Sequence, residues 1–129
     1  MQCETCSQFK LAAIDLDGTL LGPRHAVSEE NLRAVRRLQD SGAHVVLASG
    51  RHYNSMRKYA DALPGVEWIV SCQGGEVADL RRTTVLSRKF LAAAEVAAVV
   101  KTGCASGFTT VSYTADGIFT DSAWDDELE

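Results

Sequence analysis

Short apolar runs alternate with amphipathic segments along most of the chain, and this alternation predicts an α/β fold. The expected strands are residues 11–14, 43–48 and 67–72, and the expected helices are residues 28–40 and 53–63. Ser28 is a typical N-cap for the first helix, and Pro64-Gly65 ends the second. The order strand, helix, strand, helix, strand predicts a doubly wound parallel sheet, and continuous apolar runs are typical of strands buried on both faces.

After Gly75 the pattern changes, which predicts a second packing unit. The expected elements are a hairpin at residues 76–86, a helix at residues 91–102, and two strands at residues 108–113 and 117–120. We therefore divide the chain into a leader, the N-terminal part of an α/β core and a partial α+β segment, at residues 1–9, 10–80 and 81–129. The acidic tail at residues 124–129 is expected to be solvated.

Two polar motifs follow the first two expected strands. Asp15-Leu16-Asp17-Gly18-Thr19 comes directly after the first strand, and Ser49-Gly50-Arg51 comes directly after the second. In open parallel sheets, ligands bind beyond the carboxyl ends of the strands. The two motifs are therefore expected to share one site.

The residue types in these motifs suit phosphoryl transfer. Asp15 and Asp17 can reach one cavity, and a divalent cation with oxygen ligands such as Mg²⁺ would offset their repulsion. One carboxylate can attack phosphorus while the other protonates the leaving oxygen and later deprotonates water. The Ser49 hydroxyl and the Gly50 amide can hold phosphate oxygens, and Arg51 can anchor phosphate or a distal substrate group.

These motifs resemble those of the haloacid dehalogenase superfamily. Asp15 to Leu21 is similar to its first motif and Ala48 to Arg51 to its second, while Ser71 to Val77 resembles the signature after the third strand in Cof-type phosphatases. The resemblance covers about residues 10–120. It implies a Rossmann-like core and a magnesium-dependent phosphatase that acts on a small phosphorylated metabolite through an aspartyl phosphate.

The resemblance also implies a role for each motif residue. Asp15 would be the nucleophile and a magnesium ligand, and Asp17 the general acid and base, with its backbone carbonyl on magnesium. The phosphate-binding set would be Leu16 through its amide, Thr19 as a brace of the loop, Ser49, Gly50 through its amide, and Arg51. One loop and one helix fill the segment between the two motifs, so a cap would follow the third strand.

The sequence departs from the family pattern at three places. Gln73 stands where the family usually has asparagine, and Gln73-Gly74-Gly75 is as consistent with a plain turn as with a substrate contact. Lys89 and Lys101 lie in cap-like sequence, so neither matches the third-motif lysine. Asp125-Asp126 lacks the context of the fourth-motif acidic pair.

These departures leave two other functions open. The chain would be a truncated, non-catalytic fragment that folds or binds a partner, or a phosphotransferase or mutase that uses the same aspartate. In the resembling fold, one neighbour of the first strand comes from sequence after the cap. Without it, residues 11–14 would present an unpaired apolar edge, and we expect self-association there.

Composition narrows the classes of partner. The net charge of −4 argues against sequence-independent nucleic-acid binding, and the longest apolar runs are too short to span a membrane. The polar N-terminus does not resemble a secretory signal, so a cytoplasmic location is expected.

The remaining cysteines and histidines have plain interpretations beside functional ones. Cys3 and Cys6 form a C-x-x-C with the spacing of half a zinc site, but no second pair completes such a site, and both are expected to be dispensable. Cys72 and Cys104 are expected to be packed thiols. His52 lies near the motifs but is expected to be a solvated or packing residue.

Overall fold

The computed structural model describes residues 9–121, which fall into two compact units. The first unit ends at Arg88 and the second begins at Lys89. Cys3, Cys6 and the acidic tail lie outside the described residues, so the expectations for them stay predictions. Within residues 9–121, no helix combines the length and the hydropathy that a membrane crossing requires.

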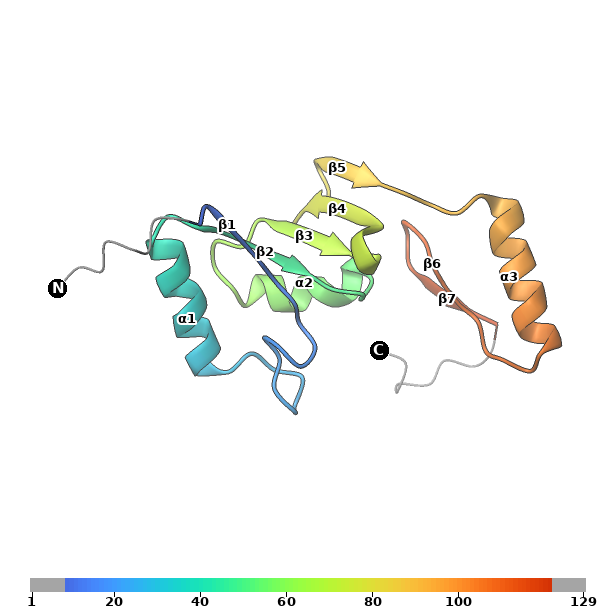
Figure 1. The fold of residues 1–129 in the computed structure, drawn as a ribbon, viewed down its shortest axis with the longest axis horizontal. Coiled ribbons are helices and arrows are strands. Elements are labelled where there is room, and N and C mark those ends of the chain that lie inside the picture. The colour runs from blue at the N-terminus through green and yellow to red at the C-terminus, as the bar shows by residue number, and fades with distance from the viewer. Residues whose placement is uncertain (1–8, 122–129) are drawn as a thin grey trace. The chain divides into compact units, whose positions relative to one another are not determined.

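The first unit is built on a five-stranded sheet with the order β1-β2-β3-β4-β5 (Figure 1). The strands are β1 (Leu11–Ile14), β2 (His44–Ala48), β3 (Trp68–Ser71), β4 (Glu76–Asp79) and β5 (Val85–Arg88). The first three pair in parallel, whereas β4 and β5 are antiparallel to their neighbours. The α/β fold class with a partial Rossmann-like core is therefore confirmed.

Two helices connect the parallel strands, and local signals in the sequence set their ends. Helix α1 (Glu29–Asp40) begins after Ser28, whose hydroxyl accepts the Asn31 N–H at 3.1 Å. Helix α2 (Tyr53–Asp61) begins after His52. Both crossovers step in the same direction along the sheet, so right-handed connections put both helices on one face. No helix in the described part of the first unit covers the other face.

The core of the first unit lies between that face and the two helices. Leu47 and Ile69 are partners in the parallel register and are fully buried. The rest of the core comes from the helices and from the loop after β1, with Val35, Met56, Tyr59, Leu63, Leu16 and Leu20 among its members. The buried leucines of the loop tie the first polar motif to the core.

Strand β1 differs from the prediction that it is buried on both faces. Leu11 is 58% exposed, and exposed and half-buried positions alternate along the strand. The alternation arises because the described helices cover only one face of the sheet: Ile14 packs against the core on that face, whereas Leu11 lies on the uncovered face. Strand β1 is also an edge strand, since it pairs with β2 on one side and no described strand pairs with its other side. The edge expected from the sequence is therefore present among the described residues.

The hairpin expected after Gly75 is confirmed, and it extends the first sheet. A turn centred on Asp79 closes it: the carboxylate accepts the backbone N–H groups of Arg81, Thr83 and Thr84 and the Thr83 hydroxyl. The Thr83 hydroxyl is the main reason why the pKa of Asp79 is lowered. The second unit begins after this hairpin, at Lys89, which is eight residues beyond the predicted boundary at 80/81.

The second unit consists of helix α3 (Ala93–Ala105) and the antiparallel hairpin β6 (Val111–Tyr113) and β7 (Ile118–Thr120). Its secondary structure agrees with the predicted helix and pair of strands. None of residues 89–121 is buried, and Val99, Phe108 and Phe119 are more than half exposed. That this unit is the start of a cap remains a prediction.

The burial of Leu47 and Leu11 predicts opposite outcomes for the same substitution. Leu47→Ala is expected to lower the free energy of unfolding by about 2–5 kcal/mol, because it opens a cavity between β2 and the helices. Leu11→Ala at the exposed edge is expected to change it by less than about 1 kcal/mol. Urea denaturation followed by circular dichroism measures both, and equal losses would contradict the assigned core.

Candidate active site

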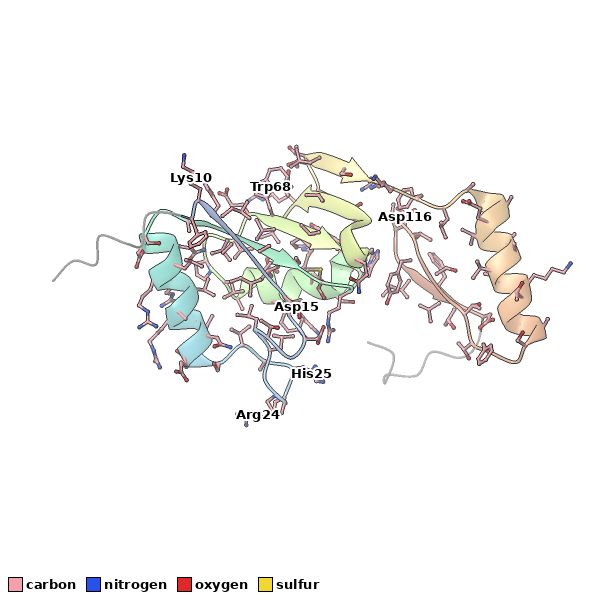
Figure 2. All side chains as sticks on the ribbon, in the orientation of Figure 1. Lys10, Asp15, Arg24, His25, Trp68 and Asp116 are labelled. Carbon is pink, nitrogen blue, oxygen red and sulfur yellow. The ribbon has the colours of Figure 1, made fainter. Side chains whose placement is uncertain are left out.

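The loop after β1 places two carboxylates at the end of the strand. Leu16 is fully buried between Asp15 and Asp17, which are both exposed, so the anchored leucine fixes its neighbours at the sheet edge. The Thr19 hydroxyl donates to Asp15 Oδ2 at 3.3 Å. Gly18 has a φ of 73°, a left-handed conformation that lets the loop turn back. Figure 2 shows Asp15 where β1 runs into this loop.

The second motif continues directly from β2. The Ser49 N–H donates to the Val70 carbonyl at 3.0 Å, which prolongs the pairing with β3. The Ser49 side chain is turned toward the following backbone, because its hydroxyl accepts the Arg51 N–H at 3.2 Å. Ser49 is buried, whereas Gly50 and Arg51 are half-buried. The motif is therefore a tight turn held by the sheet.

A bidentate ion pair joins the two motifs. Arg51 Nε and Nη2 donate to Asp17 Oδ2 and Oδ1, each at 2.8 Å. The arginine side chain is 14% exposed and also lies over the Tyr59 ring, with Cζ 5.7 Å from the centroid. The hydrogen bond from Arg51 lowers the pKa of Asp17, against a smaller opposing effect of burial. In this arrangement Asp17 is held ionised.

A third turn, after β3, lies against the second motif. The Cys72 N–H donates to the Arg51 carbonyl at 2.9 Å, and the Gln73 N–H donates to the Ser49 carbonyl at 3.2 Å. The Gln73 side chain lies over Gly50, where a Cβ would come within 2.5 Å of Gln73 Nε2. The structure thus brings together all the predicted site residues with Gln73.

The oxygen donors present suit Mg²⁺, but only in part. The Asp15 carboxylate and the backbone of the same loop offer oxygen, which this cation prefers, and water commonly completes its shell. Within residues 9–121, no three His, Cys, Asp or Glu side chains gather in a way that could hold a metal ion. The loop can therefore supply only part of a ligand set.

His25, which the motifs do not include, approaches the site through the loop before α1. Its Nδ1 lies 3.9 Å from Asp17 Oδ1, and Figure 2 shows it beside Arg24 at the tip of that loop. The Gly22 N–H donates to the Ala26 carbonyl at 3.1 Å and closes the loop. No sequence motif marks this histidine, because its position depends on how the loop folds back.

A buried acidic residue also escaped the sequence analysis. The Glu76 side chain is 5% exposed and pairs with two arginines: Arg82 Nη2 lies 2.7 Å from Oε1, and Arg88 Nε lies 2.5 Å from Oε2. The Arg82 guanidinium lies 4.1 Å from the centroid of the Tyr53 ring. The network ties the hairpin to α2, since Arg82 contacts both Glu76 and Tyr53. The residues of this network come from three separate segments, so no local sequence pattern predicts the network.

His52, Cys72 and Cys104 lie in different environments, and only some of the expectations for them hold. His52 is 1% exposed and caps α2, where Nδ1 accepts the Asn54 N–H at 3.3 Å, so the expectation of a packing residue is confirmed. Cys72 is half-buried, and burial raises its pKa. The expectation of a packed thiol is wrong for Cys104, which is exposed and donates to Asp121 at 3.0 Å. Every residue of helix α3 is exposed or half-buried, so the helix has no buried position that could hold this thiol.

Comparisons with known proteins agree on one family. The family described as haloacid dehalogenase-like hydrolase matches residues 12–129. The chain is 37% identical over 83 residues to 5-amino-6-(5-phospho-D-ribitylamino)uracil phosphatase YcsE of Bacillus subtilis, covering 64% of this chain and 33% of that protein. It is 30% identical over 77 residues to pyridoxal phosphate phosphatase YbhA of Escherichia coli, covering 60% of this chain and 28% of that protein.

Solved structures have the same fold. A haloacid dehalogenase-like hydrolase from B. subtilis superposes with a TM-score of 0.81 at 29% identity, over 93% of this chain and 41% of the other. A protein from Geobacillus kaustophilus superposes with a TM-score of 0.75 at 27% identity, over 92% of this chain and 45% of the other. The chain spans about a third or less of the curated relatives described above and less than half of these solved chains.

The ion pair between Arg51 and Asp17 predicts how Asp17 titrates. Arg51→Gln is expected to raise the pKa of Asp17 toward the ordinary aspartate value near 3.8, because the main cause of its lowering is removed. A carboxyl group with a lowered pKa stabilises the fold above its unfolded pKa, and this contribution is lost as the pH falls through the folded pKa. NMR titration of the side-chain carboxyl carbons measures the shift. An unchanged Asp17 titration in the variant would contradict the ion pair.

Proposed function

The chain belongs to the family of haloacid dehalogenase-like hydrolases, and we propose that it carries the nucleophile-bearing half of a magnesium-dependent phosphomonoesterase. The single observation that carries the proposal is the ion pair between Arg51 and Asp17, which brings the two polar motifs into one site. The relatives support the reaction class, because YcsE and YbhA are both named as phosphatases.

The proposed reaction has two steps, with Asp15 as the nucleophile. An Asp15 carboxylate oxygen attacks phosphorus, the ester P–O bond breaks, and the leaving oxygen takes a proton from Asp17. The ionised Asp17 then takes a proton from water, whose oxygen attacks the aspartyl phosphate and releases inorganic phosphate. The 3.3 Å contact from Thr19 supports the role of Asp15, because it limits which carboxylate oxygen is available.

Asp17 must be protonated before the first step, and Arg51 opposes this in the present arrangement. A guanidinium also binds phosphate oxygens in a bidentate manner, so the substrate phosphate competes with Asp17 for Arg51. When the arginine turns to the phosphate, the main cause of the lowered pKa of Asp17 is removed. In this proposal, substrate binding itself prepares the general acid.

Phosphate would rest on the second motif. The Leu16 and Gly50 amides and the Ser49 hydroxyl are proposed to hold the phosphoryl oxygens, with Arg51 above them. Preorganised donors of this kind stabilise the charge that develops in the transition state. Mg²⁺, held by the Asp15 carboxylate and the Asp17 backbone carbonyl with water, would neutralise part of the phosphate charge when bound.

The substrate class is a small organic phosphomonoester. YcsE is named for a phosphorylated ribitylaminouracil and YbhA for pyridoxal phosphate, two compounds that differ in their leaving groups and share only the phosphate ester. The described site contains groups for the phosphate and little that would select the leaving group.

A non-catalytic role for the chain alone is the second candidate, and one observation favours it. Among the described residues of the first unit, Arg51 forms an ion pair with Asp17, and His25 Nδ1 lies 3.9 Å from the same carboxylate. A site with so few charged groups holds phosphate weakly, and losing one stabilising donor costs roughly 10²- to 10³-fold in rate. Alone, the chain would bind phosphate or a partner without appreciable turnover.

The first catalytic prediction concerns Asp15 in a completed protein. A chimera would continue this chain with the C-terminal part of the solved B. subtilis hydrolase, from the end of the superposed region onward. The chimera is expected to hydrolyse an aryl phosphate with Mg²⁺, and Asp15→Asn is expected to reduce turnover to near background because the amide is a poor nucleophile. Initial rates of phenolate release measure both.

Two controls separate the roles of the residue and of the chain. Asp40→Asn, an exposed aspartate at the end of α1, should leave the chimera as active as before. The unextended chain should show turnover near background. If Asp15→Asn retained most of the activity, the nucleophile would be another group, and Mg²⁺-dependent turnover by the unextended chain would show that it completes its own site.

The open edge of β1 predicts self-association. The strand is apolar, its outer side pairs with no described strand, and such edges pair with other chains. Light scattering of the purified chain is expected to give a mass above that of a monomer. Leu11→Lys should shift the population toward monomers, whereas Val99→Lys in the second unit should not. A monodisperse wild-type monomer would contradict the prediction.

A further inference from the structure

The turn after β3 has a backbone conformation that ordinary residues avoid. Cys72, Gln73 and Gly74 have φ values of 52°, 56° and 86°, so three consecutive residues are left-handed. Only glycine adopts this conformation freely, and each other residue costs roughly 1–2 kcal/mol. Such local strain tends to occur at functional sites, where the surrounding structure enforces it.

Hydrogen bonds bind this turn to the second motif. The Cys72 and Gln73 N–H groups donate to the carbonyls of Arg51 and Ser49, and the Gly75 N–H donates back to the Cys72 carbonyl. Buried Glu76, with its two arginines, holds the chain immediately after the turn. The strained conformation therefore has a fixed position relative to the residues proposed to bind phosphate.

The strain determines where the Gln73 side chain lies. Its carboxamide covers Gly50 so closely that a Cβ on residue 50 would meet Nε2 at 2.5 Å and Cδ at 3.2 Å. Gln73 is itself exposed, so burial of its side chain does not explain the conformation. If this segment were only a turn, asparagine or glycine would suit position 73 better, because both adopt left-handed conformations at lower cost.

We propose that Gln73 is a further phosphate-binding residue, whose carboxamide N–H donates to an oxygen of the substrate phosphate beside the Gly50 amide. The inference rests on the proposed phosphatase function and assigns one further ligand to the same site. It explains why a longer side chain stands at a strained position: the carboxamide must extend over Gly50. The ligand class is a phosphate monoester dianion or inorganic phosphate.

Binding of inorganic phosphate to the purified chain in Mg²⁺ tests the proposal without turnover. It is measured by ³¹P NMR titration, beside unfolding in urea. Gln73→Glu keeps the length of the side chain but replaces the donor with a negative charge, and should weaken phosphate binding at least about ten-fold, as expected for hydrogen bonds to charged groups. Gln73→Asn should weaken binding while unfolding at equal or higher urea, because asparagine fits the left-handed turn and does not reach as far.

The chain contains a matched control. Gln39 also lies over a glycine, with Nε2 2.8 Å from where a Cβ on Gly65 would be, at the opposite ends of the strands. Gln39→Glu should leave phosphate binding unchanged wherever circular dichroism shows the variant folded. If wild type binds phosphate and Gln73→Glu and Gln73→Asn bind equally well, this inference is wrong while the proposed function stands. If the wild type binds no phosphate, both this inference and the proposed function are wrong.

Discussion

The site depends on one interaction, the bidentate ion pair between Arg51 and Asp17. It connects the ends of two strands that also pair through their backbones, and it sets both the orientation and the charge of the second aspartate. An ion pair this exposed on one side adds little to stability, because solvent screens it. Its importance lies in chemistry: one guanidinium is shared between a carboxylate and a prospective phosphate.

The sheet provides the frame for this arrangement. Parallel pairing brings the carboxyl ends of β1, β2 and β3 to one edge, and each strand is followed by a turn with a separate task. Buried Leu16 anchors the first turn, Ser49 anchors the second, and hydrogen bonds to the second turn anchor the third. Because the three turns are held by the sheet and by each other, small changes in Gly50 or Gln73 would be felt across the whole site.

The sequence predicted most of the elements and both motifs, because their signals are local. Ser28, the Pro64-Gly65 stop and the apolar runs each act within a few residues, and the structure agrees with them. What it did not predict depends on distant pairs. Leu11 was predicted to be buried because an apolar run does not reveal which helices or strands will cover it. The partners of Glu76 and His25 are distant in sequence and come together only when the chain has folded.

The strand order in the first unit has a consequence for biosynthesis. The five strands stand side by side in the same order in which they occur along the chain, so every strand pairs only with its predecessor and successor. Contacts between sequence neighbours form quickly, and domains tend to fold N-terminal part first during translation. The sheet can therefore grow by one strand at a time as the polypeptide leaves the ribosome, and none of the later strands that the structure describes adds to the outer side of β1.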